Sequence, residues 1–154
     1  MLKTSASLTA LLLAVALAGT PALAVTEDAH DAHGAAGLEL SLDDGQKWQT
    51  DPPLRAAMET IRNAAAPVAD DDAASSAEYG ALSAAVQSQV DYMIENCELP
   101  PDADAQLHVL LGQVIEGAEQ LAGDEPEAGM TAVVGALEAY DVYFDHDGWE
   151  PLAH

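Results

Sequence analysis

A cysteine, a methionine and two histidines are the side chains of this sequence best suited to binding a soft metal ion. Cys97 is the only cysteine, it stands just before Pro100-Pro101, and His108 follows eleven residues later. A thiolate, a thioether and an imidazole together favour Cu(I) or another soft ion. The predicted metal ligands are therefore Cys97, His108, Met58 and His146, provided that the fold brings them together.

Four amphipathic segments must position these residues. Apolar residues recur at helical spacing over about 50–67, 77–97, 102–122 and 127–144. The two prolines end the second segment and allow the third to begin. Four helices with short connections predict an all-α, antiparallel up-down-up-down four-helix bundle, with an extended N-terminal arm and an irregular C-terminal tail. In this bundle Cys97, His108, Met58 and His146 share one end.

Each predicted ligand also has an ordinary structural explanation. Met58 falls on the apolar stripe of its segment, and methionine commonly fills gaps in cores. Cys97 continues the apolar seam of the second segment, whereas His108 lies on the flank of the third. A purely structural or protein-interaction module with no small ligand is therefore an alternative, with Trp48, Trp149 and the acidic surface making the contacts.

Haem is a lesser alternative ligand. Met58 and His108 lie on the first and third segments and could serve as axial ligands across a bundle. The Cys-x-x-Cys-His attachment motif is absent, so only noncovalent haem is compatible with the sequence. Stripes rich in Leu and Val leave little space for a macrocycle.

No sequence motif indicates catalysis. The chain contains no Gly-x-Ser-x-Gly, no phosphate-binding loop and no His-Glu-x-x-His. A Cys97–His108 nucleophile pair would place the thiol on a buried seam, with no orienting group evident. We therefore expect a binding or accessory protein and not an enzyme.

The N-terminus has the pattern of a secretory signal peptide. Lys3 supplies a positive charge, residues 8–18 are apolar, and Ala22-Leu23-Ala24 is a small-residue cleavage site. We expect cleavage after Ala24, a periplasmic or secreted protein, and no membrane insertion of the mature chain. The predicted division is a signal peptide over 1–24, a flexible tail and extended arm over 25–49, and the bundle with its C-terminal tail over 50–154.

The sequence is strongly acidic. It has 27 acidic and four basic residues, a formal charge of −23, and loss of Lys3 with the signal would leave three basic residues and a charge of −24. Such a surface repels nucleic acid and anionic lipid. It is typical of a halophile's protein, and is also compatible with a basic partner protein. Lys47, Arg55 and Arg62 are expected to form ion pairs rather than an anion site.

Three stretches together resemble small exported proteobacterial proteins filed under the name DnrO. They are Leu42-Asp43-Asp44-Gly45-Gln46-Lys47-Trp48-Gln49-Thr50-Asp51 with Leu54-Arg55, the stretch 97–108, and Phe144-Asp145-His146-Asp147-Gly148-Trp149 with Pro151-Leu152. The resemblance covers most of the mature chain. It implies a small exported helical protein and brings no activity with it.

Overall fold

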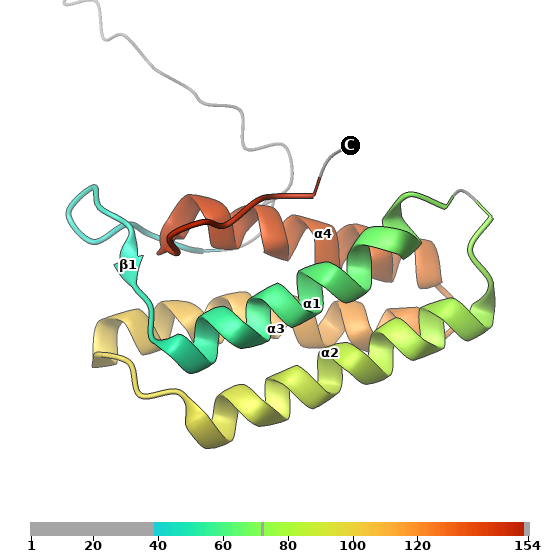
Figure 1. Cartoon of the computed structure of the whole chain (residues 1–154), viewed down its shortest axis with the longest axis horizontal. Helices are drawn as coiled ribbons and strands as arrows, with labels where there is room; N and C mark the ends of the chain where they lie inside the picture. The colour runs from blue at the N-terminus through green and yellow to red at the C-terminus, as the bar shows by residue number, and fades with distance from the viewer. Residues whose placement is uncertain (1–38, 72, 153–154) are drawn as a thin grey trace, which may run out of the picture. The chain divides into compact units, whose positions relative to one another are not determined.

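An antiparallel four-helix bundle forms the part of the chain that the computed structural model describes, residues 39–71 and 73–152 (Figure 1). The helices are α1 (Pro52–Ala69), α2 (Ser76–Asn96), α3 (Pro101–Ala122) and α4 (Pro126–Tyr143). The predicted all-α fold class is thus confirmed. The expected signal peptide at 1–24 and the first part of the expected tail, 25–38, lie outside the described residues.

Capping residues explain where the helices start. Asp51, close to the start predicted at about residue 50, caps α1 by accepting a hydrogen bond from the Leu54 N–H at 2.8 Å. Ser75 and Glu78 form a capping box at the start of α2. Helix α1 runs two residues beyond Pro67, the residue at which the sequence predicted its end. Pro67 is exposed, so water can solvate the carbonyl that lacks its N–H partner.

The Pro100-Pro101 bend separates α2 from α3 as the sequence predicted. Cys97 is the C-cap of α2, and its N–H donates to the Met93 carbonyl. Pro101 is the first residue of α3, where a missing N–H has no cost. Because its backbone is already extended, Cys97 lies at the end of the helix and outside its last turn.

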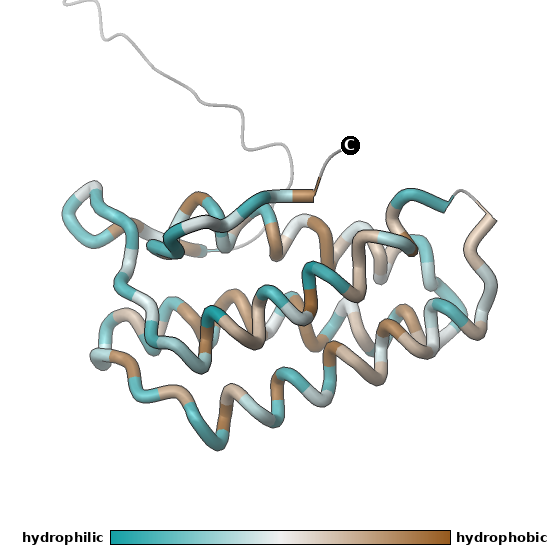
Figure 2. The backbone as a smooth tube through the Cα atoms, in the orientation of Figure 1, coloured by the Kyte–Doolittle hydropathy of each residue, from teal (hydrophilic) through white to brown (hydrophobic). Residues whose placement is uncertain are grey.

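Hydrophobic residues recur at helical intervals along the four helices and meet in one core (Figure 2). Helices α3 and α4 approach most closely at Gly117 and Gly129, which are both buried. A Cβ added to Gly129 would lie 2.5 Å from the Leu121 nitrogen and 2.6 Å from the Gly117 oxygen. The largest side chains buried in this core include Tyr140, Phe144, Leu54, Met58, Ile61, Leu110 and Leu137.

The extended arm before α1 finds its partner at the other end of the sequence. Strand β1 (Trp48–Gln49) pairs in parallel with β2 (Phe144–Asp145), the two residues that follow α4. A tight turn precedes β1, with reciprocal Asp43–Gln46 backbone hydrogen bonds of 2.8 and 2.9 Å. Asp44 and Gly45 both have positive φ, 48° and 85°, as a type I′ turn requires. The sequence predicted the arm and the turn, but no partner strand.

The C-terminal tail, residues 146–152, lies along α1 and α4 (Figure 1). These two helices contact each other less than the other neighbouring pairs do. Trp149 packs against Tyr140 with ring centroids 4.8 Å apart, and Leu152 packs against the core. The tail therefore completes the burial of α1 and α4.

Candidate functional site

The four predicted metal ligands occupy different environments. Met58 is fully buried in the core, whereas the His108 side chain is 70% exposed on α3. Cys97 is half-buried at the Pro-Pro bend, and His146, the first residue of the C-terminal tail, has a buried side chain. Met58 and His108 therefore do not face each other across the core, as axial haem ligands would.

The Cys97 thiol belongs to a cluster around the Asp51 carboxylate. Oδ1 of Asp51 accepts from the Leu54 N–H, and Oδ2 accepts from the Glu98 N–H at 2.7 Å. The thiol also donates to Asp51. Burial, followed by the negative charge of Asp51, raises the pKa of Cys97 to about 12, and Asp104 adds to this effect. A thiol in this setting is a poor nucleophile at neutral pH.

His108 faces solvent one turn after Asp104. Its Nδ1 lies 2.8 Å from the Asp104 carbonyl oxygen and 3.5 Å from its carboxylate. Since Asp104 acts electrostatically on Cys97 and contacts His108, both residues lie near the start of α3, as predicted. In the described part of the chain, however, no three His, Cys, Asp or Glu side chains form a group that could hold a metal ion.

His146 is the most enclosed polar side chain of the predicted set. Its side chain is only 3% exposed, with Nδ1 3.1 Å from the Tyr140 hydroxyl and Nε2 3.2 Å from a Glu59 carboxylate oxygen. Because a carboxylate only accepts, a neutral His146 donates from Nε2 to Glu59 and accepts at Nδ1 from Tyr140. Burial raises the pKa of Tyr140, so this phenol is not an activated nucleophile.

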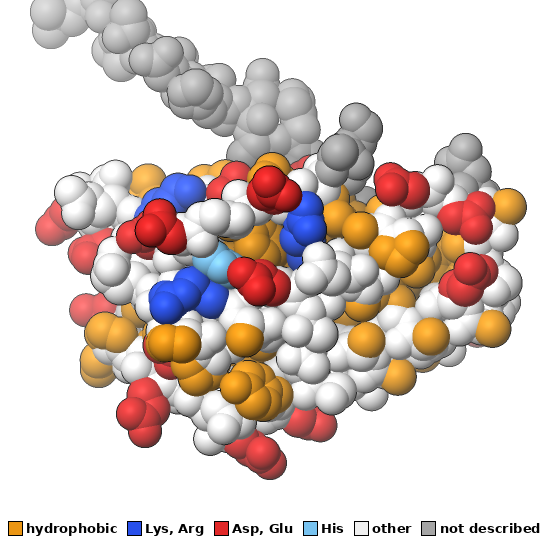
Figure 3. Space-filling view, in the orientation of Figure 1, with side chains coloured by type: hydrophobic (Ala, Val, Ile, Leu, Met, Phe, Trp, Pro, Cys, Tyr) orange, Lys and Arg blue, Asp and Glu red, His pale blue; other side chains and the backbone are white. Residues whose placement is uncertain are grey.

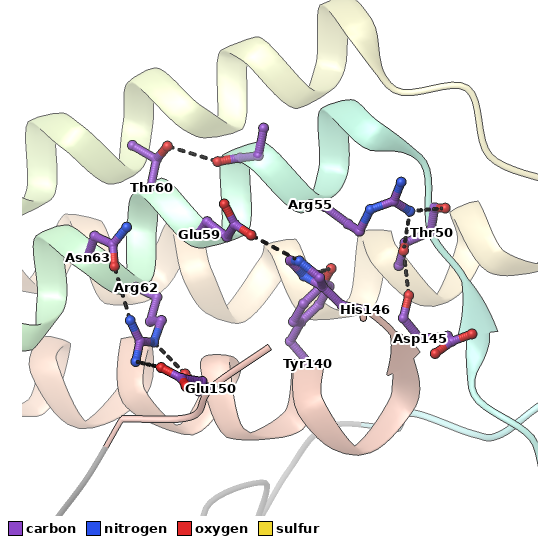
Figure 4. A network of polar contacts seen from close by, with 11 residues as sticks. Thr50, Arg55, Glu59, Thr60, Arg62, Asn63, Tyr140, Asp145, His146 and Glu150 are labelled. Atoms are coloured by element: carbon purple, nitrogen blue, oxygen red, sulfur yellow. Dashed lines mark hydrogen bonds and ion pairs between the residues drawn. The ribbon is translucent and has the colours of Figure 1, made fainter. Parts of the chain in front are cut away.

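Further polar contacts extend this cluster into a network between α1 and the C-terminal segment (Figure 4). Thr50 donates from its hydroxyl to the Asp145 carbonyl, and Arg55 donates to the Thr50 carbonyl and hydroxyl at 2.7 and 3.0 Å. Arg62 donates to the Glu150 carbonyl. The network therefore fastens the tail and β2 to the start of α1, and its chemistry is structural.

The three Lys and Arg residues of the described chain share one face, around α1 and the tail (Figure 3). Lys47 lies 3.5 Å from Asp141, and Arg62 lies 3.8 Å from Glu150, which confirms the expected ion pairing for these two residues. Arg55 instead binds Thr50. Nothing in this arrangement indicates a shared anion site.

The chain after α1 is acidic and partly apolar on its surface. Residues 63–154 contain 19 of the 27 acidic residues and no Lys or Arg. On α2, Ile94 is 71% exposed, and on α3, Ile115 is 40% exposed. The sequence pattern predicted neither isoleucine as a surface residue. The helical position of Ile94 lies outside the buried seam of Val86, Val90 and Met93, and this offset could have identified it as exposed.

The two tryptophans that the sequence offered as contact residues pack on their own bundle. Trp48 and Trp149 are both partly buried against the core. Nε1 of Trp48 donates to the Ser41 carbonyl at 2.6 Å, whereas the buried Nε1 of Trp149 has no hydrogen-bond partner among the described residues. Their indole rings therefore pack mainly against the protein's own core.

Comparison with models of protein families, with curated proteins and with solved structures finds no match to this chain. None of the described helices is both long and apolar enough to cross a membrane.

Proposed function

We propose that this protein is exported and acts as a binding module for a cationic protein partner. The observation that carries this proposal is the segregation of charge along the chain. From residue 63 onward there is no Lys or Arg, yet the acidic surface of α2 exposes a large apolar side chain, Ile94. Ile94 is 71% exposed and Ile115 on α3 is 40% exposed, so this acidic surface also offers apolar side chains to a partner.

Electrostatics supports a cationic partner. A field of one sign accelerates the encounter with an oppositely charged protein and repels acidic competitors. The basic residues do not interrupt this field, because they lie between positions 47 and 62 and two of them are paired with carboxylates. Export rests on the signal-peptide pattern of residues 1–24, which predicts a mature chain that begins at Val25.

The soft-metal hypothesis has less support. Its thiol is protonated at neutral pH and hydrogen-bonded to Asp51, and its imidazole faces solvent. Metal binding requires the thiolate form, so an ion would have to displace both the proton and the Asp51 contact. Binding of Cu(I) at Cys97 and His108 is therefore the less supported hypothesis, and the titration described below tests it.

Peptide binding tests the proposed function. The probe is a fluorescent amphipathic helical peptide of Leu and Lys, and the control is the same peptide with Glu in place of Lys. At 0.15 M salt we expect the Leu/Lys peptide to bind more tightly than it binds an unrelated protein of equal net charge, and the Leu/Glu peptide not to bind. If the Leu/Lys peptide shows no preference over the unrelated protein, the proposal is wrong.

A further inference from the structure

We infer that the partner docks as a helix along the boundary between α2 and α3, an inference that rests on the proposed function. The contact between Ser83 and Ala118 marks where these helices meet, since the buried Ser83 hydroxyl donates to the Ala118 carbonyl at 2.6 Å. Exposed residues on the same sides of the two helices therefore border this boundary. They form the docking strip: Gln87, Asp91 and Ile94 on α2, with Asp104, His108, Ile115 and Glu119 on α3.

Helical spacing places Ile94 in the docking strip. It follows Ser83 by eleven residues, which is about three turns, so the two side chains leave α2 in nearly the same direction. Ser83 is 2% exposed, but Ile94 is 71% exposed. The side of α2 that faces α3 is thus buried near the start of α2 and exposed to solvent near its end.

Helix α3 contributes a row of exposed side chains to the same strip. Asp104, His108, Ile115 and Glu119 follow one another at intervals of four, seven and four residues, which keeps them on one side of the helix. The His108 side chain is 70% exposed and Ile115 is 40% exposed. His108, which the sequence singled out as a metal ligand, therefore belongs to this exposed row.

The pattern of the strip specifies its occupant. The antiparallel register set by Ser83 and Ala118 puts Ile94 level with residue 107, so Ile94 and Ile115 lie roughly 12 Å apart along the bundle at 1.5 Å per residue. A partner helix spans this distance in about eight residues, or two turns. Carboxylates of Asp91, Asp104 and Glu119 flank the two isoleucines. The complementary ligand is an amphipathic helix with apolar residues seven or eight apart and Lys or Arg beside them.

A second copy of this chain fits the strip poorly. Two copies of the strip would bring carboxylates together with no Lys or Arg from α2, α3 or α4 to neutralise them. The basic residues before and on α1 are already engaged, Lys47 with Asp141, Arg62 with Glu150 and Arg55 with Thr50. Charge complementarity therefore favours a separate, cationic helix.

Matched variants of the whole protein test the docking strip with the Leu/Lys peptide, designed with leucines seven residues apart. Ile94→Ser removes the apolar anchor, and Val142→Ser, at a valine 44% exposed on α4, is its control. Because both side chains are exposed, both variants should fold. We expect Ile94→Ser to weaken peptide binding about tenfold, equivalent to about 1.4 kcal/mol, and Val142→Ser to leave binding unchanged.

A second pair of variants separates specific charge contacts from net charge. One variant neutralises Asp91, Asp104 and Glu119 as Asn, Asn and Gln. The control neutralises Asp124, Glu125 and Glu127 in the same way, at the connection between α3 and α4. We expect a greater loss of affinity in the first variant, although the net charge changes equally.

Each outcome of these experiments has one meaning. If the peptide binds the wild-type protein but Ile94→Ser and the Asp91/Asp104/Glu119 variant weaken binding no more than their controls do, the strip is wrong while the proposed function stands. If a peptide of scrambled order binds equally well, an amphipathic helix is not the ligand. A wild-type dimer in sedimentation equilibrium that Ile94→Ser dissociates would instead identify a second copy as the occupant. No binding to the wild-type protein removes the function and the strip together.

Discussion

Replacing Asp51 should disconnect the start of α1 from the bend between α2 and α3. The carboxylate accepts from the Leu54 N–H at 2.8 Å and from the Glu98 N–H at 2.7 Å. Loss of the N-cap costs about 1 kcal/mol. Loss of the second, charge-assisted bond costs about 1–2 kcal/mol, near the lower limit because that bond is exposed. Asp51→Ala should therefore lower the free energy of unfolding by about 2–3 kcal/mol.

Asp51→Asn divides this effect into its two parts. Asparagine is an equally good N-cap, so its amide oxygen can still accept from the Leu54 N–H. Its amide nitrogen cannot accept from Glu98, and it carries no charge. We expect Asp51→Asn to lose only about 1–2 kcal/mol, the cost of the missing link to the bend. Urea denaturation followed by circular dichroism measures both variants.

Alkylation of Cys97 gives an independent measure of the same contact. With a pKa raised to about 12, only about one wild-type molecule in 10⁴ carries the thiolate at pH 8, so iodoacetamide should react slowly. Asp51→Asn removes the charge and the hydrogen-bond acceptor but not the burial. The reaction should therefore accelerate several-fold and stay below the rate in urea. Wild-type alkylation as fast as in urea, or two Asp51 variants as stable as the wild type, would refute this reasoning.

Three further predictions concern the helix contact, the buried phenol and the soft-metal hypothesis. Gly129→Ala should destabilise the protein by about 2 kcal/mol, because the added Cβ would meet the backbone of α3. Gly112→Ala has open space around it and should stabilise the protein by up to about 1 kcal/mol. Thermal unfolding of both variants measures the difference. The raised pKa of Tyr140 means that the folded protein keeps a proton that the unfolded chain loses above pH ~10, so Tyr140 should lower the stability there by about 1.4 kcal/mol per pH unit. Tyr140→Phe should reduce the slope of stability against pH by this amount in urea titrations, and the remaining slope includes the contribution of Cys97, whose pKa is raised as well. An anaerobic Cu(I) titration should show weak binding that Cys97→Ala and His108→Ala leave unchanged, and a tight site lost in both variants would restore the metal hypothesis.

The elements that the sequence predicted well are those with local signals. The Pro100-Pro101 bend fixes the end of α2 and the start of α3 through residues only a few positions away. Four long periodic segments then leave few arrangements other than a bundle. The choice of Asp51 over Thr50 as the cap could not be made in this way, because both residues cap helices well and only the position of the carboxylate decides.

The candidate sites depended on information that is not local. The burial of His146 follows from the path of the tail after α4, and a two-residue parallel pairing such as Trp48 with Phe144 has almost no sequence signal. His108 lay at the edge of its apolar stripe, where a small rotation of α3 decides between core and solvent. Ile94 was predictable, because the wheel position of this isoleucine lies outside the buried seam of α2.

The pairing of β1 with β2 has a consequence for the order in which the molecule assembles. The strand nearest the amino end of the described chain cannot dock until the residues after the last helix are present. A nascent polypeptide must therefore leave Trp48 unpartnered while almost a hundred further residues are added. The pairing of β1 with β2 is therefore a late step of folding, and removal of residues 144–154 would release Trp48 and Gln49 as well.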